Sequence, residues 1–320
     1  MIGAVLAAVL ATSSVQMSES KLGVHLLGAG YTEGIRQILA SGPRVIKILG
    51  LEHGFDPNML RAMAEYKRMF PDGIVVARVW TPRTWGLNVI PEQAAREFYA
   101  QVLEGPLNKL APEERAMIDY VEGPNEYDST PAFESVEAAR WFNRFWIKLA
   151  GILARDGWRS NIGSIAVGNP GGSPEEMEAI WREFLPAMEA AHRLGGTWGY
   201  HSYTIHYSTD MEKEQWYAFR YRKLREIAVR LKPHLADMPL ILTEGGVDYA
   251  GNKDTDGWLA RGTAQQFQDW LKWFETELQK DDYVLGVTLF QIGDPQNWPS
   301  FELETLAPWL ADHLRRMRGS

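Results

Sequence analysis

The stretch MIDYVEGPNE, residues 117–126, decides how the chain is interpreted. Its apolar first half predicts a buried strand over residues 117–121, and a Gly-Pro pair stops that strand abruptly. Glu126 then follows the carboxyl end of the strand, which is where α/β barrels place their chemistry. A second apolar run, residues 239–243, leads in the same way into Glu244. Two strands that each end in a glutamate predict a pair of carboxylates facing one another across a site.

Strand-like and helix-like segments alternate along the chain from Lys21 onward. Thr32 and Ser173 are suitable N-caps for helices, and Pro57 fits a first helical turn. The expected strands cover residues 22–27, 45–49, 74–80, 117–121, 161–167, 198–203, 239–243 and 284–290. The expected helices cover residues 32–42, 56–70, 91–110 with a break near Gly105-Pro106, 135–155, 173–194, 213–231, 263–279 and 305–317.

These segments form eight strand-helix units whose strands are short and apolar on both faces, which is typical of a parallel sheet covered by helices. Eight units with no leftover domain favour an α/β fold of the (β/α)8 TIM-barrel type over an open, doubly wound sheet. No Gly-rich dinucleotide motif follows the first strand, and there is no phosphate-loop motif. We expect a single catalytic barrel over residues 21–320.

The segment before the barrel, residues 1–20, begins with an apolar run that Thr12-Ser13-Ser14 ends, as in the core and exit of a signal peptide. No basic residue precedes Lys21, and the run is too short to span a bilayer. Two interpretations stay open: the remnant of a signal, or an apolar segment packed on the domain. The first favours a secreted or extracellular protein over a cytoplasmic one. Neither predicts stable membrane insertion.

Composition narrows the possible classes of function. A net charge of −8 argues against nucleic acid or an anionic membrane surface as a partner. The absence of cysteine excludes disulfides, thiolate chemistry and Cys-ligated zinc. Most of the 13 tryptophans are expected to pack helices on the barrel. Trp80 and Trp298 lie near strand ends and are candidates for stacking on a sugar ring.

All strand ends of a closed barrel meet on one face, so Glu126 and Glu244 are expected to share one cleft. Retaining glycosidases need two carboxyl groups roughly 5–5.5 Å apart. Other polar or aromatic side chains near strand ends are expected around them: His25, Lys47 or His53, Trp80, Asn125, His201, Tyr203 and Gln291.

Three of these features together resemble clan A of the glycoside hydrolases, which includes the cellulase, mannanase and β-galactosidase barrels. Members carry an Asn-Glu pair at the end of strand four, as in Asn125-Glu126, and a glutamate at the end of strand seven, as in Glu244. Many cellulase-like members also have His-x-Tyr at the end of strand six, which His201-Ser202-Tyr203 matches. The resemblance covers the barrel from Lys21 to Met317.

The resemblance implies a cofactor-independent retaining glycosidase that cleaves β-glycosidic bonds of a polysaccharide or oligosaccharide by double displacement. It makes Glu126 the general acid/base and Glu244 the nucleophile. Tyr203 would donate a hydrogen bond to Glu244, Asn125 would contact the sugar 2-hydroxyl, and His201 would lie near the reacting ring. The other candidate substrate contacts are Trp80, His25, Gln291 and Trp298.

The chain also departs from the family pattern. Tyr127 follows Asn-Glu where members usually have proline, and Lys47 and His53 occupy the unit where many have an arginine that braces the nucleophile. Arg78 is a candidate substitute for that arginine. Phe290-Gln291 stands where many members have a tryptophan. These differences indicate a divergent member.

Two other classes of function stay open. One is a barrel that binds carbohydrate without cleaving it, or that mainly transglycosylates. The other is a metal-dependent barrel hydrolase, which the sequence disfavours because His-Glu-x-x-His and an early His-x-His are both missing. We expect no metal site, a monomer and a carbohydrate as the partner. Asp128, Asp248 and Asp294 are interpreted as solvated loop acids.

Overall fold

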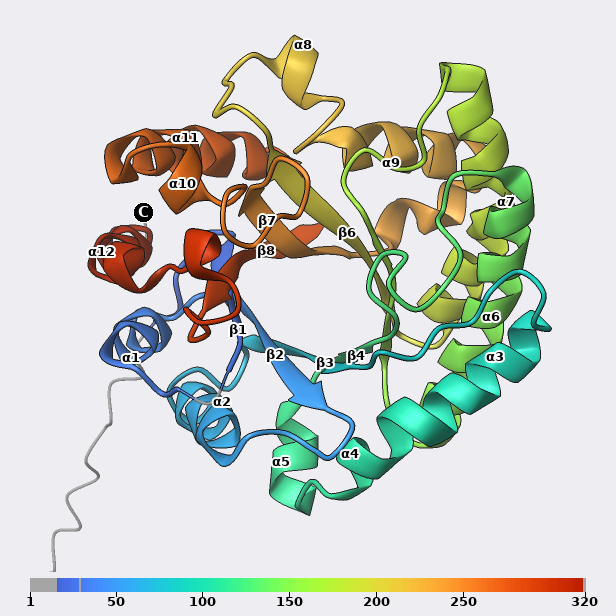
Figure 1. Cartoon of the computed structure of the whole chain (residues 1–320), viewed down its shortest axis with the longest axis horizontal. Helices are drawn as coiled ribbons and strands as arrows, with labels where there is room; N and C mark the ends of the chain where they lie inside the picture. Colours follow the sequence, from blue (N-terminus) through green and yellow to red (C-terminus); the bar gives the residue numbers. More distant parts are fainter. Residues whose placement is uncertain (1–15, 29, 319–320) are drawn as a thin grey trace, which may run out of the picture.

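The computed structural model describes residues 16–28 and 30–318, and in it eight parallel strands close into a barrel in chain order (Figure 1). The strands are β1 (Leu22–Leu26), β2 (Val45–Leu51), β3 (Ile74–Trp80), β4 (Tyr120–Glu122), β5 (Ser160–Ile165), β6 (Thr197–Thr204), β7 (Leu240–Val247) and β8 (Val284–Ile292). The predicted single-domain (β/α)8 barrel is confirmed. Most of the apolar segment expected over residues 1–20 lies outside the described residues.

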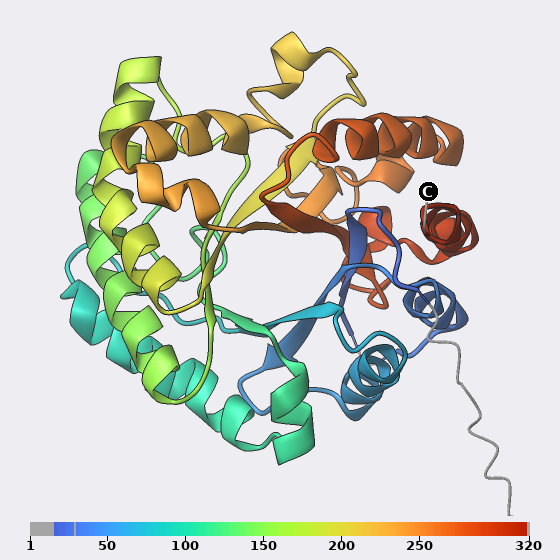
Figure 2. The same ribbon diagram turned by 180° about the vertical axis from the view of Figure 1, so that it is seen from behind.

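Helices surround the barrel, as the views from both ends show (Figures 1 and 2). They are α1 (Glu33–Ala40), α2 (Pro57–Met69), α3 (Pro91–Phe98), α4 (Glu104–Asn108), α5 (Pro112–Met117), α6 (Val136–Arg155), α7 (Pro174–Arg193), α8 (Met211–Glu214), α9 (Arg220–Leu231), α10 (Trp258–Arg261), α11 (Ala264–Leu278) and α12 (Ala307–Arg316). In the described part of the chain, no helix has both the length and the apolar character needed to cross a membrane.

The helices begin where side chains can satisfy their free N–H groups. Thr32 accepts a hydrogen bond from the Ile35 N–H, and Ser135 accepts one from the Ala138 N–H. Ser173 and Glu176 form a capping box at the beginning of α7. The helix beginnings predicted from Thr32, Ser135 and Ser173 are therefore confirmed.

Several predicted boundaries were wrong. The strand predicted over residues 239–243 continues to Val247, so Glu244 lies within β7 and does not follow it. The strand predicted over residues 117–121 begins only at Tyr120, because residues 112–117 form a helix that was not predicted, α5, whose beginning Pro112 and acidic first-turn residues favour. The helix predicted from residue 213 begins at Arg220; the shorter α8 precedes it and ends at Glu214, whose side chain is buried. The predicted break near Gly105 comes earlier, as a π-helical turn, η1 (Tyr99–Leu103).

Most of the apolar core lies between the strands and the outer helices. Aromatic side chains of α6 and α11 supply much of it, and they are all buried: Trp141, Phe142, Phe145, Trp146, Phe267, Trp270 and Phe274. Large buried rings remove much apolar area from water, which is the main driving force for docking each helix. The expected packing role holds for the most deeply buried tryptophans, which are Trp146, Trp181, Trp198, Trp258 and Trp270.

Inside the barrel, an apolar floor lies below a polar layer. Val45, Val76, Tyr120 and Ile241 form a small buried cluster near the beginnings of β2, β3, β4 and β7. Side chains alternate between the two faces of a strand, so the residues two positions further on face inward as well. Those on β2, β3 and β4 are charged: Lys47, Arg78 and Glu122. The floor therefore keeps water from below a layer of buried charges.

Candidate active site

Glu244 lies at the centre of this polar layer. Its side chain is buried, and Tyr203 Oη donates a hydrogen bond of 2.9 Å to its Oε2. His201 and Tyr203 lie two residues apart on β6, so both face the barrel interior, and His201 pairs in register with Glu244. Burial and the charge of Glu244 raise the pKa of Tyr203 well above its usual value, so the hydroxyl stays protonated and remains a donor.

Glu126 follows β4 in a loop whose backbone is sharply bent. Its φ is 44°, in the left-handed region that side chains with a Cβ rarely adopt, and its N–H donates to the Ser164 carbonyl on β5 at 2.9 Å. The bend directs the carboxylate over the barrel. There Glu126 Oε1 lies 2.6 Å from His201 Nδ1.

One imidazole joins the two carboxylates. His201 Nδ1 lies 2.6 Å from Glu126 Oε1 and 3.6 Å from Glu244 Oε2. Because both oxygens approach the same ring nitrogen, they lie no more than about 6 Å from each other. Burial disfavours the imidazolium, but the charges of Glu244 and Glu126 outweigh it and raise the pKa of His201.

Three basic side chains surround the other oxygen of Glu244. Its Oε1 lies 3.3 Å from Lys47 Nζ, 3.6 Å from Arg78 Nη1 and 3.8 Å from His25 Nδ1. Burial alone would raise the pKa of Glu244, but the charges of His201, Lys47 and Arg78 hold it well below its usual range. Glu244 is therefore a carboxylate across the whole neutral range.

Lys47 also binds a carboxylate that the sequence did not single out. Its Nζ donates to Glu122 Oε1 at 3.0 Å, and both side chains are fully buried. A signal was present, because Lys47 and Glu122 are charged residues next to apolar strand positions. His25 completes the layer; burial and the charge of Lys47 hold its pKa well below the usual value, so its ring is neutral.

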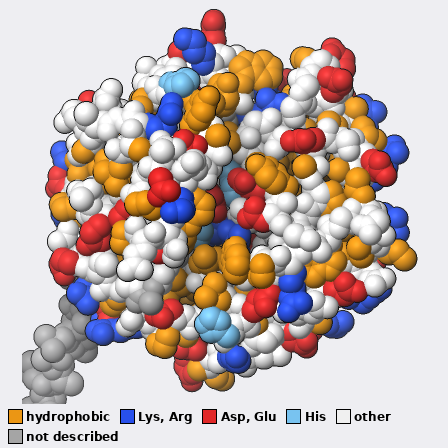
Figure 3. All heavy atoms as spheres, viewed as in Figure 1, with side chains coloured by type: hydrophobic (Ala, Val, Ile, Leu, Met, Phe, Trp, Pro, Cys, Tyr) orange, Lys and Arg blue, Asp and Glu red, His pale blue; other side chains and the backbone are white. Residues whose placement is uncertain are grey.

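The carboxylates open into a cleft of about 330 Å³ on the carboxyl side of the barrel. Figure 3 shows this hollow near the centre of the face, with acidic, basic and histidine atoms at its base. The structure brings together most of the predicted site residues as its lining: His25, Trp80, Asn125, Glu126, Tyr203, Glu244 and Trp298. His201 lies beneath them and contacts both glutamates.

Gln291 does not line the cleft. Its side chain is fully buried, and its amide nitrogen donates to the Asp294 and Trp298 carbonyls and to Glu302, each at 3.2 Å. The expected sugar contact is therefore not formed by this residue. Gln291 instead supports the loop that carries Trp298.

Two of the acids interpreted as solvated loop acids line the cleft. Asp128 Oδ2 lies 3.9 Å from Arg78 Nη2, and Asp248 lines the wall beyond Glu244. Burial raises the pKa of Asp248 to about 6. Asp294 holds its own loop, because it accepts a hydrogen bond from Asn297 Nδ2 at 3.0 Å.

Among the residues that the structure describes, no group of three His, Asp or Glu side chains is placed to hold a metal ion.

Comparison with known proteins gives a likeness in fold. No family model matches the chain, and no curated protein matches its sequence. A β-glucuronidase from Ruminococcus gnavus matches with a TM-score of 0.55 and 10% identity, over 94% of this chain and 51% of that one. An endo-β-1,4-mannanase from Thermotoga petrophila matches with a TM-score of 0.53 and 12% identity, over 94% and 77%.

A glycoside hydrolase family 5 enzyme from Prevotella bryantii matches at 14% identity with a TM-score of 0.49, over 95% of this chain and 99% of that one. The chain shares the barrel fold of the β-glucuronidase and the mannanase. The fold that the resemblance to clan A implied is thus confirmed, and the low identities fit a divergent sequence.

Proposed function

We propose that this protein is a retaining glycoside hydrolase that cleaves β-glycosidic bonds of a polysaccharide or oligosaccharide. The observation that carries the proposal is the contact of His201 with both Glu126 and Glu244. A single imidazole in reach of both carboxylates supports a short separation between them, which is the arrangement that double displacement uses.

In the first step, Glu244 attacks the anomeric carbon and forms a glycosyl ester as the bond to the leaving sugar breaks. The surrounding basic groups keep Glu244 ionised before attack, and Tyr203 fixes its orientation. Glu126 gives a proton to the departing oxygen. His201 Nδ1, which lies 2.6 Å from Glu126 Oε1, is the neighbouring group that can share this proton.

In the second step, Glu126 removes a proton from a water molecule, which attacks the anomeric carbon and releases Glu244. Two inversions at this carbon give net retention. Asn125 and His25 line the cleft beside the carboxylates and would contact sugar hydroxyls, while Trp80 and Trp298 present rings to the sugar. The His25 ring suits this role because neither of its nitrogens has a hydrogen-bond partner in the described chain.

The test is turnover of a panel of aryl β-glycosides and polysaccharides by the wild type and three variants. Glu244→Ala should lose turnover and regain part of it with added azide, giving a glycosyl azide of inverted configuration. Glu126→Gln should lose about 10²- to 10⁴-fold on substrates whose leaving group needs protonation. Glu226→Gln, exposed on α9, is the control and should behave as wild type. Unchanged turnover in both Glu126→Gln and Glu244→Ala would refute the proposal.

A further inference from the structure

Two more hollows continue from the cleft across the same face. The first, of about 670 Å³, lies between the loop after β3 and the loop after β4, and it shares Tyr127 and Asp128 with the cleft. The second, of about 500 Å³, lies between the first turns of α6 and α7 and shares Glu134 and Ser135 with the first. The cleft and the two hollows therefore form a connected row.

Apolar side chains are exposed along the beginning of this row. The Tyr127 side chain is 54% exposed and Leu87 is 46% exposed, while Trp85 lies beneath them at 6%. Large apolar side chains left in water are favourable places for a ligand to cover. The carbon-hydrogen face of a pyranose ring is such a ligand, because it is apolar and flat.

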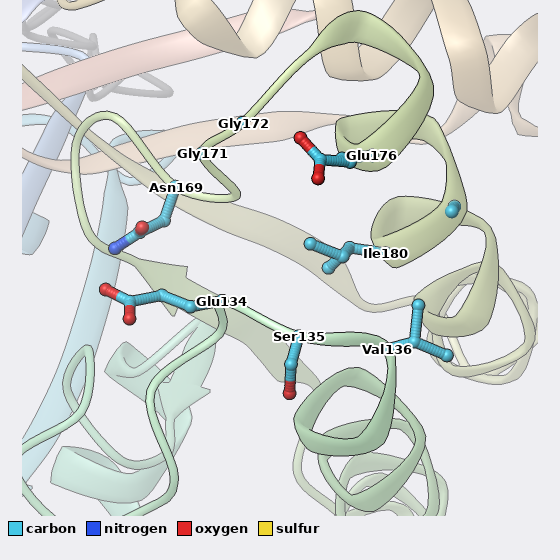
Figure 4. A pocket seen from close by; sticks show the side chains of 9 residues that line it. Glu134, Ser135, Val136, Asn169, Gly171, Gly172, Glu176 and Ile180 are labelled. Atoms are coloured by element: carbon cyan, nitrogen blue, oxygen red, sulfur yellow. The ribbon is translucent and has the colours of Figure 1, made fainter.

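Polar side chains without partners border the far hollow. The side chains of Glu134 and Asn169 form no hydrogen bond or ion pair with the described part of the chain, and they face one another from two loops (Figure 4). Ile180 of α7 provides an apolar wall between them and the helix (Figure 4). A carboxylate and an amide next to an apolar wall suit the hydroxyls and ring face of a sugar unit.

The position of the row relative to the two carboxylates indicates which part of the substrate it would hold. Tyr127 follows Glu126 directly in the chain, and neither hollow is lined by Glu244 or by the loops after β7 and β8. In the proposed mechanism Glu126 protonates the departing oxygen. The part of the substrate beyond Glu126 is therefore the leaving group.

Resting on the proposed function, we infer that the natural substrate carries a long saccharide leaving group that crosses Tyr127 and occupies both hollows. The site would thus be built for oligomeric or polymeric leaving groups rather than for small ones. Exposed Leu87 would cover a ring face, and Glu134 would accept hydrogen bonds from sugar hydroxyls.

A glycosyl fluoride tests this directly, because fluoride leaves without occupying either hollow. We would measure kcat/KM for the β-glucosyl, β-mannosyl, β-galactosyl and β-xylosyl fluorides, and for the β-linked hexasaccharide of the sugar that is cleaved. The double variant Leu87→Ala/Glu134→Ala should lower the ratio of hexasaccharide to fluoride kcat/KM about tenfold or more. The control, Leu194→Ala/Glu226→Ala, changes the same residue types at exposed positions outside the row and should keep the wild-type ratio.

The outcomes separate the two proposals. If the wild type cleaves a fluoride but the variant keeps the wild-type ratio, the leaving-group row is wrong while the glycosidase proposal stands. Equal losses on both substrates, with an unchanged thermal midpoint, would also overturn the row. If the wild type cleaves none of the fluorides, the proposed function fails and the inference fails with it.

Discussion

Lys47 is the residue on which the buried charges of the site depend. Its ammonium group lies between Glu122 and Glu244, with no exposure to water. Two carboxylates this close would repel one another strongly in a medium of low dielectric constant, and Lys47 compensates both. Arg78 approaches Glu244 from β3 but does not contact Glu122 within ion-pair distance in the described structure.

Lys47→Met should therefore destabilise the protein by about 3–5 kcal/mol, because it leaves Glu122 buried without a partner. Adding Glu122→Gln to Lys47→Met should restore much of that stability, as the uncompensated charge is gone. Urea unfolding of the two variants and the wild type measures this. A double variant as unstable as the single one would contradict the pairing.

Lys47→Met should also change the pH dependence of activity, apart from its effect on stability. Loss of one of the surrounding cations raises the pKa of Glu244, and the nucleophile must be ionised to attack. The acid limb of the pH profile of kcat/KM should therefore move to higher pH in every variant that lacks Lys47, with or without Glu122→Gln.

At the scale of elements, the contact between β4 and α6 positions Glu126. Gly123 directly follows β4, and a Cβ placed there would lie 2.4 Å from the Trp146 ring and 3.2 Å from Leu149, both on α6. The absence of a side chain lets the helix pack against the strand end. The loop that carries Glu126 begins at this contact.

Gly123→Ala should destabilise the protein by about 1–3 kcal/mol, because Trp146 must move out of a well-packed position. It should also lower kcat by displacing the Glu126 loop. Gly151→Ala provides the matched control on α6, since no atom lies within 4 Å of the added Cβ. That control should stabilise the helix by about 0.5–1 kcal/mol. Urea unfolding of both variants measures the two changes in stability. We expect them to have opposite signs, and equal signs would contradict the prediction.

At the scale of the whole molecule, the barrel closes where its first and last strands meet. β1 pairs with β8, and the residues before β1 are tied to α11 through Glu275. Ser20 Oγ donates to Glu275 Oε2 at 2.6 Å, and the Lys21 N–H donates to its Oε1 at 3.0 Å. These bonds join positions more than 250 residues apart in the chain.

Glu275→Gln should cost about 1.5–3 kcal/mol near neutral pH, because it weakens charge-assisted hydrogen bonds in a buried place. Burial raises the pKa of Glu275, but the nearby His313 and the hydrogen bonds from Ser20 and Lys21 outweigh it and lower the pKa. The wild-type advantage is therefore present above the ordinary carboxyl pKa and is lost as pH falls through the lowered value. Urea unfolding at pH 7 and in acid measures it; an advantage that persists at the lowest pH would contradict it.

The barrel and the main pair of carboxylates could be predicted from the sequence. The alternation of apolar runs with capped helices is a local signal, and eight repetitions of it leave one closed architecture. Glu126, Glu244, His201 and Tyr203 could be found because each lies at or near a strand end, and every strand end of a barrel opens on the same face.

The pairing of the buried charges could not be predicted, because it depends on contacts between distant strands. Lys47 meets Glu122 and Glu244 across separations of 75 and 197 residues, and no local pattern encodes such contacts. The same holds for Gln291, which turned into its supporting loop, and for Asp128 and Asp248, which turned into the cleft. Strand ends fix where a side chain begins, but burial and the charges of other strands decide where it points and whether it is ionised.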